Sequence, residues 1–462
     1  MNNEGSVNKM AVMPVKKLLV NMGLPIILSM MMQAAYNIVD SIFVANMENG
    51  EAALNALTLA FPIQMLMVAI AIGTGVGVNA LLSKSLGQGD AEKASRVSGN
   101  AFFLGIVIYL CFLLFGIFGV RAFVTSQSSN TEIVNMAVRY LRICCMMSMG
   151  ITCYNIMEKL LQATGRSNYS TIAQISGALV NIVLDPILIY GLLGLPKMGV
   201  DGAAWATVIG QLVSAGLGLI FHFTKNREIK NGFSYMKPSG SLIKGIYAIG
   251  FPAIIAQALM SFMTYGLNLI LGGISENAVT AYGLYYKIQQ FILFAAFGLR
   301  DAITPIISFN HGMRNKKRVK EGIKYGMIDT LIIMAIGLVL LELLANPFTS
   351  LFGLSGETRQ ICISAMRVVS LSFLFAGVNV AFQGIFQALY GGMESLVISV
   401  CRQFLFVLPI AWAFARIVQN NHDMIWLVWC TFIIAEGLTA IIGTFLMRRI
   451  SKKQIDIMEE EA

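Results

Sequence analysis

The first long apolar stretch, residues 18–44, contains a carboxylate at Asp40. An ionisable side chain inside a membrane span costs at least about 2.5–3.5 kcal/mol, so it usually faces a bundle interior or a water-filled cavity and has a function there. Gln33, Tyr36 and Asn37 precede Asp40 at a spacing of i, i+3, i+4 and i+7, which places the four polar side chains on one helix face. The sequence therefore predicts a polar surface around one carboxylate. The alternative is that Asp40 lies at the helix end, where its side chain reaches water.

A second carboxylate belongs to a later apolar stretch, residues 170–191. Asn181 and Asp185 stand at i and i+4, so both side chains face one way, and Pro186 frees a backbone carbonyl beside the carboxylate. Polar side chains on two neighbouring spans extend this surface. We expect a hydrophilic pocket made of Asp40, Asn155, Asn181, Asp185 and Thr207 and capped by Tyr36.

The chemistry of such a pocket suits a proton or Na⁺. Hard cations prefer carboxylate, amide-oxygen and hydroxyl ligands, whereas two nearby carboxylates tend to hold a proton because their charges resist joint ionisation. If the ion is Na⁺, its expected ligands are Asp40, Asn181 and Asp185. Glu158 either adds to this pocket or belongs with the adjacent Lys159 near a loop. No cofactor other than the coupling ion is expected.

In the second half of the chain, amides and aromatic rings take the place of acids. Asn379, Gln383 and Gln387 repeat every four residues, and tyrosines mark another span around Tyr282. Such a stripe either binds substrate or holds helices together, since polar contacts between membrane helices contribute roughly 0.6 kcal/mol each. Glu436 is an isolated acid that an ion pair or a helix end explains. The predicted substrate-binding residues are Gln33, Gln257, Asn268, Tyr282, Asn379 and Gln383.

The elements that must position these residues are membrane helices. The chain has 462 residues, of which 56% are hydrophobic and 12% charged, and long apolar runs recur throughout it. We expect no cleaved signal peptide, because the first apolar run is too long and no small-residue cleavage site follows it. The sequence predicts an all-α polytopic membrane protein with twelve transmembrane helices. The expected spans are 18–44, 54–82, 99–119, 134–163, 170–191, 202–222, 246–273, 278–307, 323–344, 360–389, 396–417 and 425–446.

Basic residues gather on one side of these spans. They include the runs within 225–244 and 314–324 and the basic residues at both ends of the chain. The positive-inside rule therefore places both termini in the cytoplasm. The net charge of +9 is explained as this topology signal and as attraction to an anionic leaflet, so no nucleic-acid partner is expected.

An internal repeat divides the chain into two halves of six spans. Gly23-Leu24-Pro25 in the first span corresponds to Gly250-Phe251-Pro252 in the seventh, and Gln162-Ala163 corresponds to Gln387-Ala388. Because six is even, the halves share one orientation and should be related by a pseudo-two-fold axis along the membrane normal. The expected domains are an N-lobe at 1–223, a cytoplasmic linker at 224–241, a C-lobe at 242–447 and a cytoplasmic tail at 448–462.

These features together resemble the multidrug and toxic compound extrusion (MATE) transporters over the whole chain. Asp40 and the Asn181-x-x-x-Asp185-Pro186 motif resemble the DinF- and MepA-like side of that family. The resemblance implies export of amphipathic, often cationic compounds by antiport with H⁺ or Na⁺, with the N-lobe acids as the coupling site. The NorM-like pattern is not matched, because the seventh span has no glutamate and the tenth no aspartate. A cation site in the C-lobe is therefore not expected from the resemblance.

Other classes of function fit less well. An enzyme needs catalytic groups at one depth, yet His222, His311 and His422 lie at span ends or in loops, and no P-loop supports direct use of ATP. A flippase for lipid-linked oligosaccharides needs a strongly cationic cavity, and basic residues within the spans are few. A passive channel is the third alternative. We expect a monomeric secondary transporter in the cell membrane whose partners are small drugs and the lipid bilayer.

Overall fold

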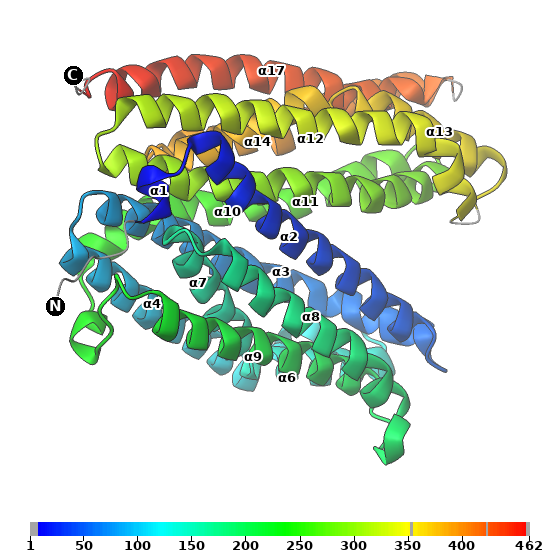
Figure 1. Cartoon of the computed structure of the whole chain (residues 1–462). Coiled ribbons are helices and arrows are strands. Elements are labelled where there is room, and N and C mark those ends of the chain that lie inside the picture. Colours follow the sequence, from blue (N-terminus) through cyan, green and yellow to red (C-terminus); the bar gives the residue numbers. More distant parts are fainter. Residues whose placement is uncertain (1–7, 352–353, 422–423, 459–462) are drawn as a thin grey trace. The chain divides into compact units, whose positions relative to one another are not determined.

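The computed structural model describes residues 8–351, 354–421 and 424–458, which form helices and loops without a β-strand (Figure 1). Residues 1–7 of the expected N-lobe and 459–462 of the expected tail lie outside this range. The helices of the first half are α1 (Lys9–Val12), α2 (Val15–Ala45), α3 (Gly50–Gly87), α4 (Ala91–Phe118), α5 (Val120–Thr125), α6 (Thr131–Met146), α7 (Met149–Ala163), α8 (Ser167–Tyr190) and α9 (Val200–Lys225), with 3₁₀ turns η1 (Leu192–Gly194) and η2 (Phe233–Met236).

The second half begins with α10. Its helices are α10 (Gly240–Gly272), α11 (Glu276–Gly312), α12 (Lys316–Leu351), α13 (Gly356–Ser370), α14 (Phe373–Ala388), α15 (Gly392–Val400), α16 (Val407–Val418) and α17 (Trp426–Ile450), with π-helical turns η3 (Cys401–Leu405) and η5 (Ser451–Ile455).

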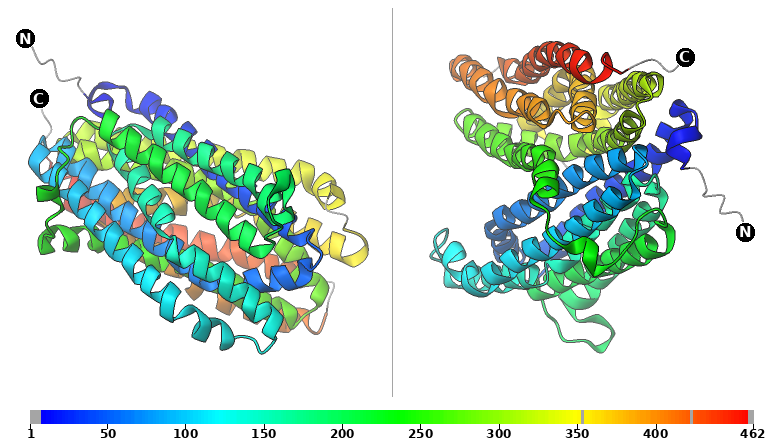
Figure 2. Two further views of the ribbon diagram at one scale, coloured as in Figure 1. Left: turned by 90° about the horizontal axis from the view of Figure 1, so that it is seen from below. Right: turned by 90° about the vertical axis from the view of Figure 1, so that its left-hand side faces the viewer.

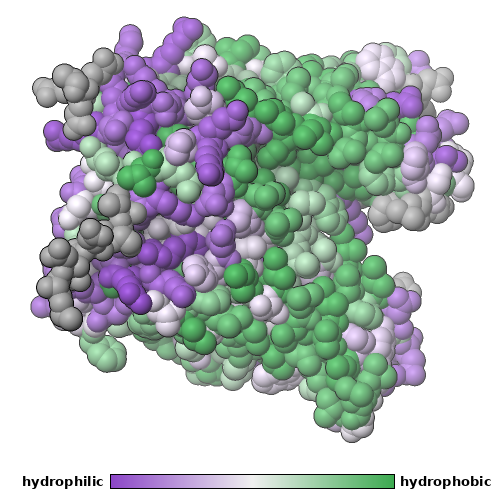
Figure 3. Space-filling view, in the orientation of Figure 1, coloured by the Kyte–Doolittle hydropathy of each residue, from purple (hydrophilic) through white to green (hydrophobic). Residues whose placement is uncertain are grey.

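The prediction of twelve spans is confirmed. Among the described residues, 10 helices are long and apolar enough to cross a membrane, and the number is 12 when two bent pairs each count as one span. The pair α6 and α7 bends by 45°, and the pair α13 and α14 by 55°. Large apolar side chains remain exposed on the helices, among them Phe118, Leu343 and Phe445. On the face seen in Figure 3, hydrophobic residues cover the middle stretches of the helices and hydrophilic residues gather at helix ends.

The chain packs as two compact units whose borders lie inside helices. The first unit contains Asn8 and Leu28–Ile254, and the second contains Lys9–Ile27 and the chain from Ile255 onward. The expected lobes follow whole helices, whereas here α2 and α10 each contribute one part to each unit. Both borders come two residues after a proline of the repeat, Pro25 in α2 and Pro252 in α10.

Glycines allow the divided helices to pack closely within each unit. In the first unit, a Cβ built at Gly73 on α3 would collide with Ile254 and would lie 2.8 Å from the Gly250 carbonyl oxygen on α10. In the second unit, a Cβ at Gly298 on α11 would lie 2.8 Å from Cα of Ile27 on α2. No side chain fits at these crossings, so the backbones themselves are in contact.

The internal repeat is visible in equivalent hydrogen bonds. Ser83 Oγ donates to the carbonyl oxygen of Ala163 at 3.3 Å, and Ser308 Oγ donates to that of Ala388 at 2.9 Å. In each pair the two residues are 80 positions apart in the sequence. The first bond joins α3 to the end of α7, and the second joins α11 to the end of α14. The two halves therefore fold by the same plan.

The turns that follow α3 and α11 also correspond. Gly89 and Arg314 both adopt a positive φ, of 72° and 58° respectively. Asp90 follows Gly89, and Asn315 follows Arg314. The side chain of each accepts a hydrogen bond from the backbone N–H three residues later, at 2.9 and 3.0 Å respectively. Arg314 holds this left-handed conformation although only glycine adopts it without strain.

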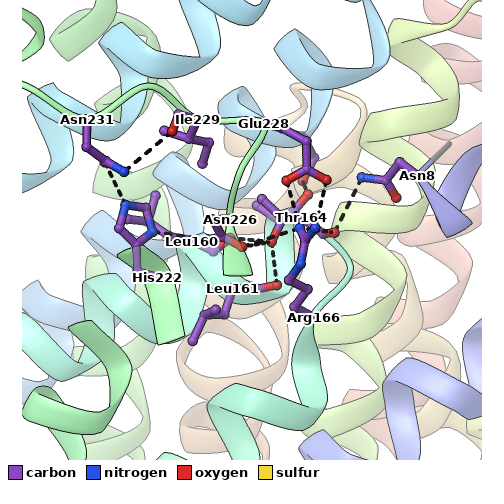
Figure 4. Close-up of polar contacts among 12 residues, drawn as sticks. Asn8, Leu160, Leu161, Thr164, Arg166, His222, Asn226, Glu228, Ile229 and Asn231 are labelled. Carbon is purple, nitrogen blue, oxygen red and sulfur yellow. Dashed lines mark hydrogen bonds and ion pairs between the residues drawn. The ribbon is translucent and has the colours of Figure 1, made fainter. Parts of the chain in front are cut away.

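The segment 224–241, expected as a linker, belongs to the first unit and is held there by a polar network (Figure 4). Arg166 forms two hydrogen bonds to the Glu228 carboxylate, at 2.8 and 3.0 Å. Asn226, which is 1% exposed, accepts from Thr164 Oγ1 at 2.7 Å, and its Nδ2 lies 3.0 Å from Nδ1 of His222. The segment is thus held at the corner between α7 and α8.

Candidate functional site

The centre of the predicted pocket is Asp185 on α8. Asp185 is 0% exposed and Asn181 is 3% exposed, and Asn181 Nδ2 donates to Asp185 Oδ1 over a long 3.4 Å. The other oxygens of the pair, Asp185 Oδ2 and Asn181 Oδ1, are buried and have no hydrogen-bond partner among the described residues. A buried carboxylate oxygen without a partner is costly, so this position favours the binding of a proton or a cation.

Asp40 on α2 belongs to the same cluster. Its side chain is half-buried, and its Oδ1 is buried without a partner in the described part of the chain. Asp40 is close enough to Asp185 for their charges to interact, and Tyr36, one helical turn before Asp40, interacts with both carboxylates. The structure therefore brings together Tyr36, Asp40, Asn181 and Asp185, as the spacing predicted. All four belong to the first unit.

Close packing of α8 on α9 positions the Asn181–Asp185 face. The two helices run side by side in Figure 2, and small residues line their contact. A Cβ built at Gly210 on α9 would lie 2.7 Å from the carbonyl oxygen of Gly177 and 3.0 Å from Cβ of Asn181. Thr207 is half-buried three residues before Gly210, so it lies on the α9 face that meets α8.

Three residues next to the cluster were not predicted. Gln64 Nε2 on α3 donates to the hydroxyl oxygen of Tyr140 at 3.0 Å and to Sγ of Cys144 at 3.8 Å, and the latter two residues are one turn apart on α6. Both Tyr140 and Cys144 interact electrostatically with Asp40. The i, i+4 spacing of Tyr140 and Cys144 is the sequence signal that marks their common face.

The polar stripe on α7 makes its own bonds. Asn155 Nδ2 donates to the carbonyl oxygen of Ile151 at 2.8 Å, which is a bond within the helix. Glu158 Oε2 lies 3.6 Å from Lys159 Nζ, and Glu158 Oε1 accepts from Gln162 Nε2 at 3.1 Å. Glu158 therefore has a cation partner, which agrees with the second of the two explanations considered for it.

The amide stripe of α14 joins helices of the second unit. Gln383 Nε2 donates to Ser399 Oγ at 2.7 Å, and Gln387 Nε2 donates to Ser395 Oγ at 3.3 Å. Asn379 Nδ2 donates to Glu436 Oε2 at 2.7 Å. These donors are used in contacts between helices, the alternative to substrate binding.

The remaining predicted substrate residues have varied surroundings. Tyr282 is 1% exposed and stacks on Trp429, with ring centroids 6.3 Å apart. Asn268 on α10 is half-buried, and its Oδ1 has no partner among the residues that the structure describes. Gln33 on α2 and Gln257 on α10 are both half-buried. Gln33, Gln257 and Asn268 are therefore partly accessible, whereas Tyr282 is buried.

No group of three or more His, Cys, Asp or Glu side chains within the described ranges is arranged to hold a metal ion. A cation at the Asp40–Asp185 cluster must therefore take part of its ligands from amides, hydroxyls or water. This donor set suits Na⁺ or a proton, and not a transition metal.

Known proteins resemble this chain along nearly its whole length. The MatE family model matches residues 25–187 and 252–413. The multidrug export protein MepA of Staphylococcus haemolyticus is 24% identical over 450 residues, which cover 96% of this chain and 97% of that protein. MepA of Staphylococcus aureus strain MRSA252 is 25% identical over 435 residues, 94% of each.

Solved structures give the same result. An outward-facing multidrug resistance MATE family transporter of the MOP superfamily superposes with a TM-score of 0.90 at 25% identity, over 96% of this chain and 98% of that one. A MOP superfamily transporter from Pyrococcus furiosus, described as having reverse polarity of its binding pocket, superposes with a TM-score of 0.87 at 25% identity, over 96% and 97%. The family model covers two segments that together exceed half of the chain, and the resemblance seen in the sequence is confirmed. The chain therefore belongs to the MatE family of multi-span membrane transporters.

Proposed function

We propose that this chain is a secondary active multidrug exporter that moves amphipathic, often cationic compounds out of the cell in exchange for H⁺ or Na⁺. Export of several drugs is supported by the relatives, which are named multidrug export proteins and align over nearly their full length. We place the protein in the cell membrane as a monomer. Both termini lie in the cytoplasm in this proposal, because the basic loops predict that orientation.

One observation supports the location of the proposed coupling site. Four acids of the described chain are less than a tenth exposed: Glu158, Asp185, Asp301 and Glu436. Three of them lie near a cation, with N–O distances of 3.6 Å to Lys159, 2.8 Å to Arg300 and 2.7 Å to Arg402. Asp185 has no such partner among the described residues, and the charge that acts on it is that of another carboxylate, Asp40. A mobile cation is the natural means of neutralising this pair.

Ion binding can drive a conformational cycle through this pair. While both carboxylates are charged, repulsion and poor solvation disfavour a tightly packed first unit. When H⁺ or Na⁺ neutralises them, the helices α2 and α8 can pack more closely, and a different conformation becomes favoured. Asn181 donates a hydrogen bond to Asp185, and Tyr36 is close enough to both acids for their charges to act on it. A drug bound in the opposite conformation then dissociates outside the cell.

The same cations argue against the flippase alternative. Lys159, Arg300 and Arg402 each have an acidic partner within the spans. Neutralised cations do not provide the positive surface that lipid-linked phosphates require.

Transport into inverted vesicles tests the proposal. A pH gradient and a Na⁺ gradient are imposed separately, and accumulation of a fluorescent cationic drug is followed before and after an ionophore dissipates each gradient. We expect uphill accumulation with one of the gradients, and drug and ion should weaken each other's binding by one common factor, because coupling is reciprocal. Accumulation that is indifferent to both gradients, or independent equilibrium binding of drug and ion, contradicts antiport.

A further inference from the structure

The second unit contains a buried ion pair whose carboxylate is fully bonded. Arg402 donates from Nε and Nη2 to Glu436 Oε1, at 3.0 and 2.7 Å. Asn379 Nδ2 donates to Glu436 Oε2 at 2.7 Å and to the Glu436 carbonyl oxygen at 3.0 Å. Arg402, Glu436 and Asn379 are 6%, 7% and 0% exposed. A cation attached to the chain itself thus neutralises this acid, in contrast to Asp185.

The backbone around Arg402 is specialised. Arg402 lies in the π-helical turn η3, where the Phe406 N–H donates to the carbonyl oxygen of Cys401 at 3.0 Å. A π turn inserts one extra residue into a helix and is frequent at functional sites. In η3, Arg402 and Gln403 are buried, whereas Phe404 and the residue after it are exposed. The turn therefore directs a guanidinium and an amide into the bundle.

Two buried amides of this region have an oxygen that accepts no hydrogen bond within the described residues. Asn379 Oδ1 and Gln403 Oε1 are buried and accept no hydrogen bond from the described part of the chain. The Asn379 oxygen belongs to the same amide that binds Glu436, and Gln403 directly follows Arg402. The Glu436 carboxylate and the Asn379 amide oxygen are hard oxygen ligands of the kind that bind a small cation.

We propose that Glu436 and Asn379 form a monovalent-cation site that the guanidinium of Arg402 occupies permanently. In the proposed function the first unit takes a positive charge from solution. In the second unit that positive charge is the side chain of Arg402. The second unit then takes no part in ion exchange, which leaves coupling to the first unit. This site can be tested by binding alone, so a failure of the transport proposal leaves it unaffected.

The test removes the tethered cation and asks whether Na⁺ replaces it. Arg402→Ala is purified in detergent, and its melting temperature and its binding of radioactive Na⁺ are measured in NaCl and in choline chloride at equal ionic strength. The matched control is the double variant Arg402→Ala/Glu436→Gln, which has the same space but no carboxylate. A Na⁺ response from the first unit is common to both proteins, so the difference between them reports on Glu436 alone.

We expect Arg402→Ala to melt at a higher temperature as Na⁺ is added, with a shift that grows with the logarithm of its concentration. Arg402→Ala should bind one more Na⁺ than the double variant does. Arg402→Lys keeps a tethered charge and should show no added response. Equal Na⁺ responses of Arg402→Ala and the double variant overturn the proposal. The proposal is also overturned if Arg402→Ala aggregates in every salt while the double variant is recovered in folded form. In that case no small cation replaces the guanidinium.

Discussion

At the scale of single residues, Asp185 differs from the other buried acids by the lack of a cation near it in the described structure. We expect Asp185→Asn and Asp40→Asn each to reduce gradient-driven export by about 5–150-fold, the usual range of a coupling free energy of 1–3 kcal/mol. The asparagine keeps the size of a protonated aspartic acid but cannot change its charge, so drug can still bind. Efflux from cells with equal amounts of each variant measures the effect.

The two substitutions should not add. The double variant Asp40→Asn/Asp185→Asn should be scarcely worse than either single variant, because groups that act as one unit are not additive. Asp201→Asn is the control, since Asp201 forms a surface ion pair with Arg139 at 3.0 Å and such pairs contribute little. Wild-type efflux with Asp40→Asn would remove that residue from the mechanism.

Gln383 illustrates how a contact changes a prediction made from the stripe alone. The sequence suggests that Gln383→Ala alters which drugs are exported, but the side chain donates to buried Ser399 Oγ at 2.7 Å. We now expect Gln383→Ala to destabilise the protein by about 0.5–1.5 kcal/mol, because a buried hydrogen bond between helices is lost while Ser399 Oγ keeps its bond to the carbonyl oxygen of Ser395 at 3.1 Å. Melting temperature and export of several drugs are measured together. Altered selectivity at an unchanged melting temperature would instead support substrate binding.

At the scale of elements, the glycine crossing between α3 and α10 should be intolerant of side chains. A Cβ at Gly77 would collide with the carbonyl oxygen of Ile246, so Gly77→Val should force the helices apart and cost at least about 1–3 kcal/mol. Gly216→Ala on α9 is the control, because nothing lies within 4 Å of its built Cβ. Thermal unfolding in detergent compares the two. Equal melting temperatures would show that α3 and α10 do not need close packing.

The network of Figure 4 should control access to the segment 224–241. Asn226→Ala leaves Thr164 Oγ1 and His222 Nδ1 without their bonds to Asn226, at 2.7 and 3.0 Å. We expect faster trypsin cleavage after Arg227 or Lys230, because local unfolding of this segment becomes easier. Asn46→Ala is the control, since the Asn46 side chain lies in the turn after α2, is exposed and donates to the carbonyl oxygen of Ile42. Unchanged cleavage would show that Arg166 and Glu228 hold the segment without Asn226.

At the scale of the whole molecule, the distribution of basic residues predicts the orientation in the membrane. A membrane-impermeant maleimide should label Leu193→Cys, in the exposed turn η1, on intact cells. The same reagent should label Lys453→Cys, in η5, only after the cells are permeabilised. A cysteine-free parent provides the control, and labelling in the reverse order would place the termini outside the cell.

The sequence by itself determined the membrane helices and the internal repeat, and it predicted the residues of the proposed coupling site. Apolar runs long enough to span a bilayer leave helices as the only solution, since lipid cannot satisfy exposed backbone groups. The i, i+4 spacing of Asn181 and Asp185 and the i+4 step from Tyr36 to Asp40 follow from helix geometry alone. These local rules placed four of the predicted site residues on two helix faces, and the structure brings those faces together.

The tertiary structure decided which charges are neutralised and where the chain divides between the two units. Glu436 and Arg402 are 34 residues apart, and only the packing of α17 against η3 brings them to 2.7 Å. The border of the two units inside α2 and α10 depends on contacts at Gly73 and Gly298, which no helical period encodes. The physical reason is that helix periodicity reports which face of a helix is polar, whereas the partner of that face is selected by the packing of the whole bundle.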